Sequence, residues 1–192
     1  MRTRFKVILV LLLLVLVGGA ALFVYKGGLS GGPSDEEIAA ELSGGTFEPA
    51  GPGKERYTSS QFNFNMEVPE GYTITSLEEG EGRSLLVRPD DGGEDFQITV
   101  TPFDEEGPLS PERVNQDLPD MAIREPQQVV IANGAVTALI FKTDSDVYKE
   151  SREVWFVAGG NLYQLSAPVN SDPVVGPMLE SMRFESAAVE SE

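Results

Sequence analysis

The 192-residue chain contains no cysteine and no histidine. Without cysteine it has no disulfide bond, no thiolate nucleophile and no sulfur ligand for a metal ion. Without histidine it lacks the usual general base near neutral pH, the Ser/His/Asp triad and the commonest zinc ligand. These two absences exclude the most familiar catalytic and metal-binding arrangements, and the folded part has to be held together by its core alone.

Basic residues are scarce as well. The chain has 14 Lys and Arg against 31 Asp and Glu, which gives a net charge of −17. Four of the basic residues lie among the first 33, where no acidic residue occurs, so the remainder carries a net charge of −21. A domain this acidic is repelled by nucleic-acid phosphates and anionic lipid headgroups. We therefore exclude a nucleic-acid partner and expect cationic partners, divalent ions or a merely solubilising surface.

One long apolar run is present, from residue 7 to residue 25, and Arg2, Arg4 and Lys6 precede it. About 20 apolar residues are needed to cross roughly 30 Å of hydrocarbon, so this run predicts a transmembrane helix. Basic flanks stay on the cytoplasmic side, which predicts a single-pass protein of the cytoplasmic membrane with its C-terminal domain outside. The side chains expected to anchor the helix in the bilayer are Val7, Leu11, Leu14, Val17, Leu22 and Val24.

A cleavable signal peptide is the alternative interpretation of this run, because Val17 and Gly19 are small enough for a cleavage site. The apolar region of a signal peptide spans about 7 to 15 residues, whereas Leu22 and Val24 keep this segment apolar beyond such a site. We favour an uncleaved anchor. Both interpretations place the remaining chain outside the cytoplasm.

Residues 27–56 are rich in Gly, Pro and Ser and predict a flexible tether that forms no packed element. Within it, Ser34 and Glu37 have capping-box spacing and Ile38 and Leu42 follow at helical spacing, so a short helix is expected at about 35–42. Residues 185–192 are small, polar and acidic, which predicts a disordered tail. One domain is expected over residues 57–184.

Within this domain, apolar residues alternate with polar ones from Phe62 to Val68, as in a strand with one buried face. Asn133-Gly134 and Gly159-Gly160 predict two hairpin turns. A helix capped by Ser110 is expected to end near residue 118, and a last helix capped by Asp172 is expected to begin at residue 173. Further strands are expected at 85–88, 96–101, 129–131, 135–143, 154–157 and 162–167.

The return strand of the first hairpin is apolar on both sides. Ala138 and Ile140 lie on one side, and Leu139 and Phe141 lie on the other. Such a strand has to be covered on both faces. Together with the two hairpins, this pattern predicts an α+β fold with a single antiparallel β-sheet and helices on both faces.

Short motifs at the two ends of the domain resemble PsbP-like domains. They are Phe62-Asn63-Phe64 followed by Val68-Pro69-Glu70-Gly71-Tyr72, and the closing Met178-Leu179-Glu180-Ser181-Met182-Arg183-Phe184. The resemblance implies an antiparallel sheet between helical layers. The family includes extrinsic photosystem II subunits that assist calcium and chloride retention, and many exported or anchored bacterial domains. For this chain, the resemblance implies the architecture and docking on a membrane-associated assembly.

We weigh three functional classes. The first is a non-catalytic interaction domain displayed from the membrane, an accessory or docking component whose partner is an unknown membrane or extracytoplasmic protein. It requires no cofactor. Tyr57, Tyr72 and Tyr148 are the aromatic candidates for a partner surface, although aromatic residues near strand ends more often form the edge of a core. This class fits the anchor, the tether and the missing catalytic residues, and we favour it.

The second class is a divalent-cation-binding module of the calcium type. Its candidate ligands are Asp90, Asp91, Glu94 and Asp95, with Asp144 and Asp146 as a second set. Carboxylate oxygens suit calcium, but neither set has the spacing of an EF-hand loop. The alternative interpretation of both sets is a solvated acidic turn.

The third class is an enzyme. Only a Ser151 and Lys149 dyad or a Glu150 and Glu153 carboxylate pair would be open to it. No surrounding motif supports either pair, and both kinds of residue are common in soluble domains. We therefore predict that the protein is not an enzyme.

Overall fold

The computed structural model describes residues 43–59, 61–79 and 82–184. The predicted membrane anchor, the predicted helix at 35–42 and the predicted acidic tail lie outside these residues. Within them, no helix combines the length and the apolar character that a membrane span requires.

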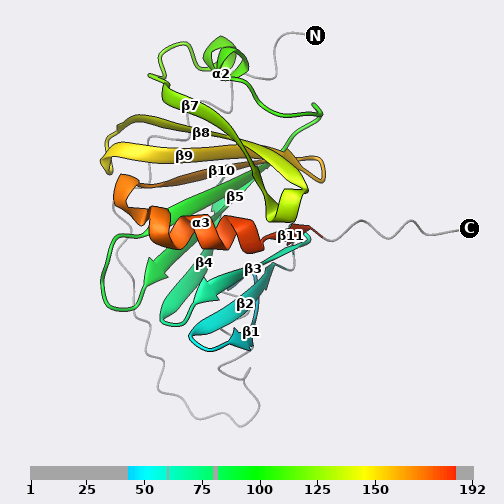
Figure 1. The fold of residues 1–192 in the computed structure, drawn as a ribbon, viewed down its shortest axis with the longest axis vertical. Coiled ribbons are helices and arrows are strands. Elements are labelled where there is room, and N and C mark those ends of the chain that lie inside the picture. The colour runs from blue at the N-terminus through cyan, green and yellow to red at the C-terminus, as the bar shows by residue number, and fades with distance from the viewer. Residues whose placement is uncertain (1–42, 60, 80–81, 185–192) are drawn as a thin grey trace, which may run out of the picture.

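The described chain forms two antiparallel sheets (Figure 1). The four-stranded sheet has the order β1 (Gly45–Gly51), β2 (Lys54–Ser59), β3 (Phe64–Pro69) and β11 (Arg183–Phe184). The seven-stranded sheet has the order β4 (Tyr72–Glu79), β5 (Gly82–Pro89), β6 (Phe96–Pro102), β10 (Asn161–Pro168), β9 (Lys149–Ala158), β8 (Val136–Ser145) and β7 (Arg124–Ile131). The α-helices are α2 (Pro111–Asp117) and α3 (Asp172–Ser181), and the short 3-10 turns are η2 (Ala132–Gly134) and η3 (Val169–Ser171).

The prediction of a single sheet was wrong, because β1 and β2 pair with each other and then with β3 to build a second sheet. The prediction that residues 27–56 form no packed element was therefore wrong from Gly45 onward. Glycine and proline suit this edge strand. Pro49 lies in β1, an edge strand of the four-stranded sheet, and edge strands are where sheets tolerate proline. A Cβ on Gly45 would lie 2.3 Å from the Thr58 carbonyl oxygen.

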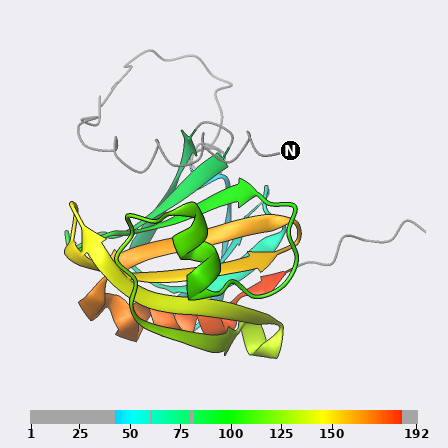
Figure 2. The same ribbon diagram turned by 90° about the horizontal axis from the view of Figure 1, so that it is seen from above.

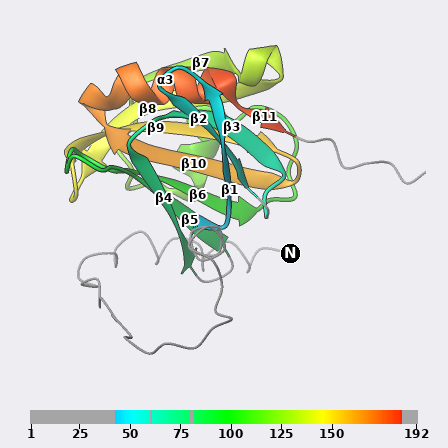
Figure 3. The ribbon, with the colours of Figure 1, turned by 90° about the horizontal axis from the view of Figure 1, so that it is seen from below.

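One face of the seven-stranded sheet, the inner face, packs against the four-stranded sheet and α3. Figure 3 shows the four-stranded sheet lying across the strands of the seven-stranded sheet. The core between them is aromatic. Phe156 stacks on Tyr163 with ring centroids 4.9 Å apart, and Phe64 meets Tyr163 edge-on at 6.0 Å. From α3, Val175, Met178 and Leu179 enter the same core.

The other face of the sheet, the outer face, packs against α2 and its flanking loops, as seen from above in Figure 2. Leu109 and Val114 join a smaller core with Leu139, Phe141 and Trp155. Ala138 and Phe156 belong to the inner core, whereas their chain neighbours Leu139 and Trp155 belong to the outer one, so successive side chains of β8 and β9 lie on opposite faces of the sheet. The predicted two-sided strand and the prediction of a helix on each face are confirmed.

Most of these elements were predicted from local sequence features such as helix caps and turn residues. The Ser110 hydroxyl accepts a hydrogen bond from the Arg113 N–H and caps α2, as predicted. The hairpin turns at Asn133-Gly134 and Gly159-Gly160 are present, with positive φ at all four residues. The predicted cap at Asp172 was wrong, because α3 already includes Asp172, whose carboxylate binds Arg152 at 2.8 Å instead. Strand β4, which carries no clear alternation, was not predicted.

Candidate functional site

A cavity of about 510 Å³ opens at one end of the inner face. Three segments that are distant in the sequence form it: the turn before β4, the loop between β5 and β6, and the η3 turn that leads into α3. The lining residues are Glu70, Gly71, Tyr72, Pro89, Asp90, Asp91, Gly93, Glu94, Phe96, Asn170, Ser171 and Val174.

The cavity is acidic with an aromatic component. Four of its lining residues carry carboxylates, and no lysine or arginine is among them. Tyr72 and Val174 contribute apolar surface beside these carboxylates, whereas Phe96 is only 2% exposed and belongs to the core. An open site with negative groups and an aromatic side chain attracts cations electrostatically and through cation–π contacts. The geometry therefore favours a positively charged ligand over an anionic one.

The four predicted metal ligands of the β5–β6 loop are only partly brought together. Asp90, Asp91 and Glu94 line the cavity, but Asp95 does not. Asp95 instead pairs with Arg88 at 3.1 Å. The hydroxyl of Thr73 donates to Asp90 at 2.7 Å. Asp91 accepts a hydrogen bond from the Gly93 N–H, which shapes the turn itself.

No group of three or more acidic side chains in the described part of the chain is arranged to hold a metal ion. In the second candidate set, Asp144 pairs with Arg124 at 2.9 Å and Asp146 is exposed in the β8–β9 turn. The calcium hypothesis stays a prediction that metal titration has to test.

Glu153 is a buried carboxylate within the sheet rather than an exposed one. It lies in the middle of β9, is 5% exposed, and faces the outer core. Its carboxylate accepts three hydrogen bonds, from the Ser151 hydroxyl at 2.6 Å, the Ser166 hydroxyl at 2.7 Å and the Trp155 indole N–H at 3.0 Å. Burial raises the pKa of Glu153, and these three hydrogen bonds offset only part of the increase.

Tyr148 connects this region to the acidic cavity. Its hydroxyl donates to the backbone carbonyl of Asp95 at 3.2 Å, so the β8–β9 turn is tied to the β5–β6 loop. Burial is the main reason that the pKa of Tyr148 is raised to about 12, and the nearby carboxylates of Asp95, Glu153 and Glu94 contribute to the same increase. The phenol thus lies among three carboxylates, at the junction between the outer face and the cavity wall.

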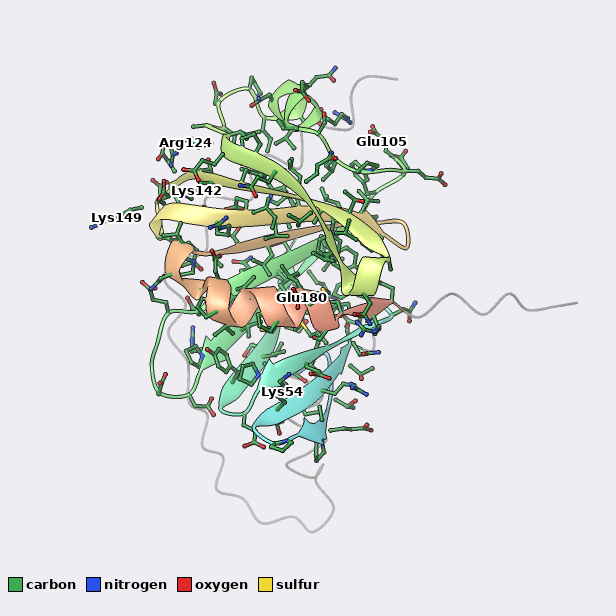
Figure 4. All side chains as sticks on the ribbon, in the orientation of Figure 1. Lys54, Glu105, Arg124, Lys142, Lys149 and Glu180 are labelled. Carbon is green, nitrogen blue, oxygen red and sulfur yellow. The ribbon has the colours of Figure 1, made fainter. Side chains whose placement is uncertain are left out.

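Neither predicted enzymatic pair is assembled. Ser151 is 1% exposed and donates to Glu153, while Lys149 is exposed and extends into solvent at the end of the molecule where β8 turns into β9 (Figure 4). Glu150 binds Arg124 at 3.0 Å. Residues 150 and 153 point to opposite faces of β9 because side chains alternate along a strand. The two members of each candidate pair therefore do not contact each other, and Ser151, Glu150 and Glu153 instead bind other side chains.

The three tyrosines considered for a partner surface lie in different environments. Tyr57 is fully buried, and its hydroxyl donates to the Ser43 carbonyl at 2.8 Å, so the candidate partner-surface role fails for it and the core interpretation holds. Alternation along β2 directs it into the core. Tyr72 is half-buried and lines the cavity, whereas Tyr148 forms the link to Asp95.

Sequence reasoning missed two of the residues that matter here. Glu70 was noted only within the Val68–Tyr72 motif of the resemblance, although it lines the cavity. Glu153 was considered as half of a surface carboxylate pair. Its position in the strand was the available signal, because Glu153 shares its face with Trp155 and Val157, which pack in the outer core.

Comparison with known proteins adds little to this description. No family model and no curated protein matches the chain. A search of solved structures found the solution structure of cyanobacterial PsbP (CyanoP) from Synechocystis sp. PCC 6803, at 11% sequence identity and a TM-score of 0.46, covering 73% of this chain and 98% of that chain. Because such a TM-score is too low to carry an argument, function has to be argued from the site itself.

Proposed function

We propose that this protein is a non-catalytic, membrane-anchored interaction domain outside the cytoplasm, an accessory or docking component of a membrane-associated assembly. We further propose that it holds a basic segment of a partner protein in the acidic cavity. The observation that carries this proposal is the lining of the cavity, which combines four carboxylates with the half-buried Tyr72 and includes no basic residue.

Charge complementarity supports a cationic partner. The chain has a net charge of −17, so its surface as a whole attracts basic proteins and speeds their encounter. The cavity adds local specificity, because Tyr72 offers an aromatic face on which an arginine or lysine side chain packs. The cavity volume of about 510 Å³ accommodates one or two such side chains and part of their backbone.

Two further observations support a non-catalytic role. The Ser151 hydroxyl, which donates to Glu153, is 1% exposed and is therefore closed to a substrate. The carboxylates that line the cavity come from a turn and a loop, and Asp90 and Asp91 already have local hydrogen-bond partners. Such a site suits recognition of a positive group better than proton transfer.

A binding experiment tests this proposal. The purified full-length chain in detergent would be titrated with a fluorescent eight-residue arginine peptide, with the corresponding glutamate peptide as a negative probe. We expect the arginine peptide alone to bind. Replacing Asp90, Asp91 and Glu94 by Asn, Asn and Gln should weaken this binding by about tenfold, which corresponds to about 1.4 kcal/mol.

The matched control neutralises three exposed carboxylates of the α2 region, Asp104, Glu106 and Asp120, in the same way. Both variants lose three negative charges, so general electrostatic attraction decreases equally in the two. Equal weakening in both variants would show that the peptide is attracted by net charge and would overturn the assignment to the cavity.

A further inference from the structure

We propose that the protein pairs with a second copy of itself through the exposed edge of β7, so that the two seven-stranded sheets join in one continuous antiparallel sheet centred on Val130. This pairing does not depend on the proposed function. The strands whose turns line most of the cavity, β4, β5 and β6, lie at the opposite end of the strand order from β7, so both cavities stay open in the pair (Figure 1).

The edge of β7 is uncharged and partly apolar. Within the described residues β7 pairs with β8 on one side and with no strand on the other, so its outward N–H and C=O groups have no ladder partner. From Gln127 to Ile131 it carries neither a charged residue nor a proline. Val130 is 62% exposed although it is apolar. An exposed, uncharged edge strand with an apolar side chain is a ready template for another strand.

The other edges of the two described sheets are obstructed or short. In β1, Pro49 lies at a register shift that interrupts the pairing with β2. Beside β4, Gly44 packs so closely that a Cβ on it would lie 3.1 Å from the Ser76 side chain. β11 has only two residues. Prolines and bulges keep edge strands unpaired, and β7 has both only at its start, at Glu125 and Pro126.

The open segment is complementary to itself, which is why a second copy fits it. In antiparallel pairing around a two-fold axis at Val130, the two Val130 side chains lie opposite each other, and Val129 lies opposite Ile131 of the second copy. Val129 and Ile131 pack against the inner core, so alternation places Val130 on the outer face. This register buries the exposed valine against its equivalent and brings no like charges together, although each chain has a net charge of −17.

Salt should strengthen this pairing. The net charge of −17 opposes the approach of two copies, whereas the paired segment itself is uncharged, so screening removes repulsion without weakening the contact. Sedimentation velocity of the full-length chain in detergent should show a dimer fraction that rises with protein concentration and with sodium chloride from about 50 mM to about 500 mM. The same increase in salt should weaken binding of the arginine peptide to the cavity, so the two associations are distinguishable.

Charge substitutions test the register. Val130→Lys places two like charges opposite each other at the axis and should raise the dissociation constant of the dimer by at least about tenfold. The matched control is Val147→Lys, the same substitution at a 65% exposed position in the β8–β9 turn, which should leave the dissociation constant unchanged. Mixing Val130→Lys with Val130→Glu should restore a dimer that contains one copy of each, because position 130 then faces an opposite charge.

A single introduced thiol reports the same contact, because the chain has no cysteine of its own. Directly opposite residues of antiparallel strands have Cα atoms about 4.5–5.5 Å apart, within the range that a disulfide spans. Under mild oxidation, Val130→Cys should therefore form a covalent dimer at least about tenfold faster than Val147→Cys, whose thiol is equally exposed but lies away from the axis.

Three results would overturn the proposal: a monomer at every protein and salt concentration, a dimer that Val130→Lys leaves intact, or equal disulfide formation by Val130→Cys and Val147→Cys. The unmodified chain provides the sedimentation test even where a variant folds poorly. If the arginine peptide fails to bind while the dimer forms and Val130→Lys dissociates it, the proposed function fails and the pairing through β7 remains.

Discussion

The two faces of the seven-stranded sheet differ in what they bury. The inner face packs against α3 and the second sheet through stacked and edge-on aromatic rings, among them Phe156, Tyr163 and Phe64. The outer face packs against α2 through a smaller apolar cluster and also buries the Glu153 carboxylate with its three hydrogen-bond donors. One strand, β9, supplies both faces, with Phe156 on one and Trp155 on the other.

Because of this difference, we expect the two faces to contribute to the stability of the fold with different pH dependence. Apolar burial on the inner face is independent of pH, and the long-range contacts there join both ends of the described chain. The outer face contains a titratable group whose ionised form is poorly solvated, so its stability depends on proton concentration. The acidic cavity lies at the edge of the inner face but is tied to the outer face through Tyr148.

The largest effect is expected on the inner face. Phe156 is 1% exposed and stacks on Tyr163, so Phe156→Ala should lower the free energy of unfolding by roughly 3–5 kcal/mol. Leu139→Ala in the smaller outer cluster should cost about 2–3 kcal/mol. Denaturant unfolding of the full-length chain in detergent measures both. A larger loss for Leu139→Ala would contradict the ranking of the two faces, and Val147→Ala, at a 65% exposed site, serves as the neutral control.

The second effect distinguishes the two faces by pH. Because folding raises the pKa of Glu153, its stabilising contribution is fully present below the unfolded-state pKa of about 4.3 and is lost as the pH rises through the folded-state value. Glu153→Gln should therefore gain stability relative to the unmodified chain between acidic and neutral pH. The gain is about 1.4 kcal/mol for each pKa unit of the increase.

Comparing the unfolding free energies of the two proteins from pH 4 to pH 8 measures this gain and cancels the repulsion among the other carboxylates. Phe156→Ala, compared in the same way, should show a difference that does not vary with pH. A constant difference for Glu153→Gln would mean that its carboxylate titrates equally in the folded and unfolded chain.

The sequence predicted what local chemistry determines and missed what only tertiary pairing determines. The alternating strand that ends near Val68, the Ser110 cap and the Asn133-Gly134 turn depend on a few neighbouring residues, and the structure contains all three, with the strand beginning at Phe64 rather than Phe62. The β1 strand depends on an edge position and on the space that Gly45 leaves for Thr58, neither of which composition reveals. The second sheet was missed for this reason.

The candidate site shows the same limit. Asp90, Asp91 and Glu94 were recognisable as an acidic turn, but the cavity exists because Glu70 and Val174 approach from distant parts of the chain. The role of Glu153 depends on strand register, which places Ser166 of β10 opposite it. The residue types predicted the negative charge of the site. The assembly of the cavity and its connection to Tyr148 could be recognised only from the fold.

A smaller effect concerns the helix that covers the outer face. The Ser110 hydroxyl accepts the Arg113 N–H at 3.2 Å, so Ser110→Ala should cost about 1 kcal/mol of stability, independent of pH. Ser110→Asp is the matched rescue variant, because aspartate caps a helix equally well. If Ser110→Ala unfolds the chain as severely as Phe156→Ala does, α2 contributes far more than a cover for a small cluster.

The smallest effect is expected from divalent ions, and it tests whether the cavity is a recognition surface or a metal site. Asp91 already accepts a hydrogen bond from its own turn, and Asp95 is paired with Arg88, so only part of the β5–β6 acidic set is available to coordinate an ion. Millimolar calcium should therefore raise the melting temperature of the full-length chain no more than the same ionic strength of a monovalent salt. The measurement is a thermal melt in calcium, in chelator and in matched sodium chloride. A ligand that binds only the folded chain stabilises it by mass action. An increase in melting temperature that is specific to calcium would therefore show that the chain binds calcium. If neutralising Asp90, Asp91 and Glu94 abolishes this increase and neutralising Asp104, Glu106 and Asp120 does not, the cavity is a cation site.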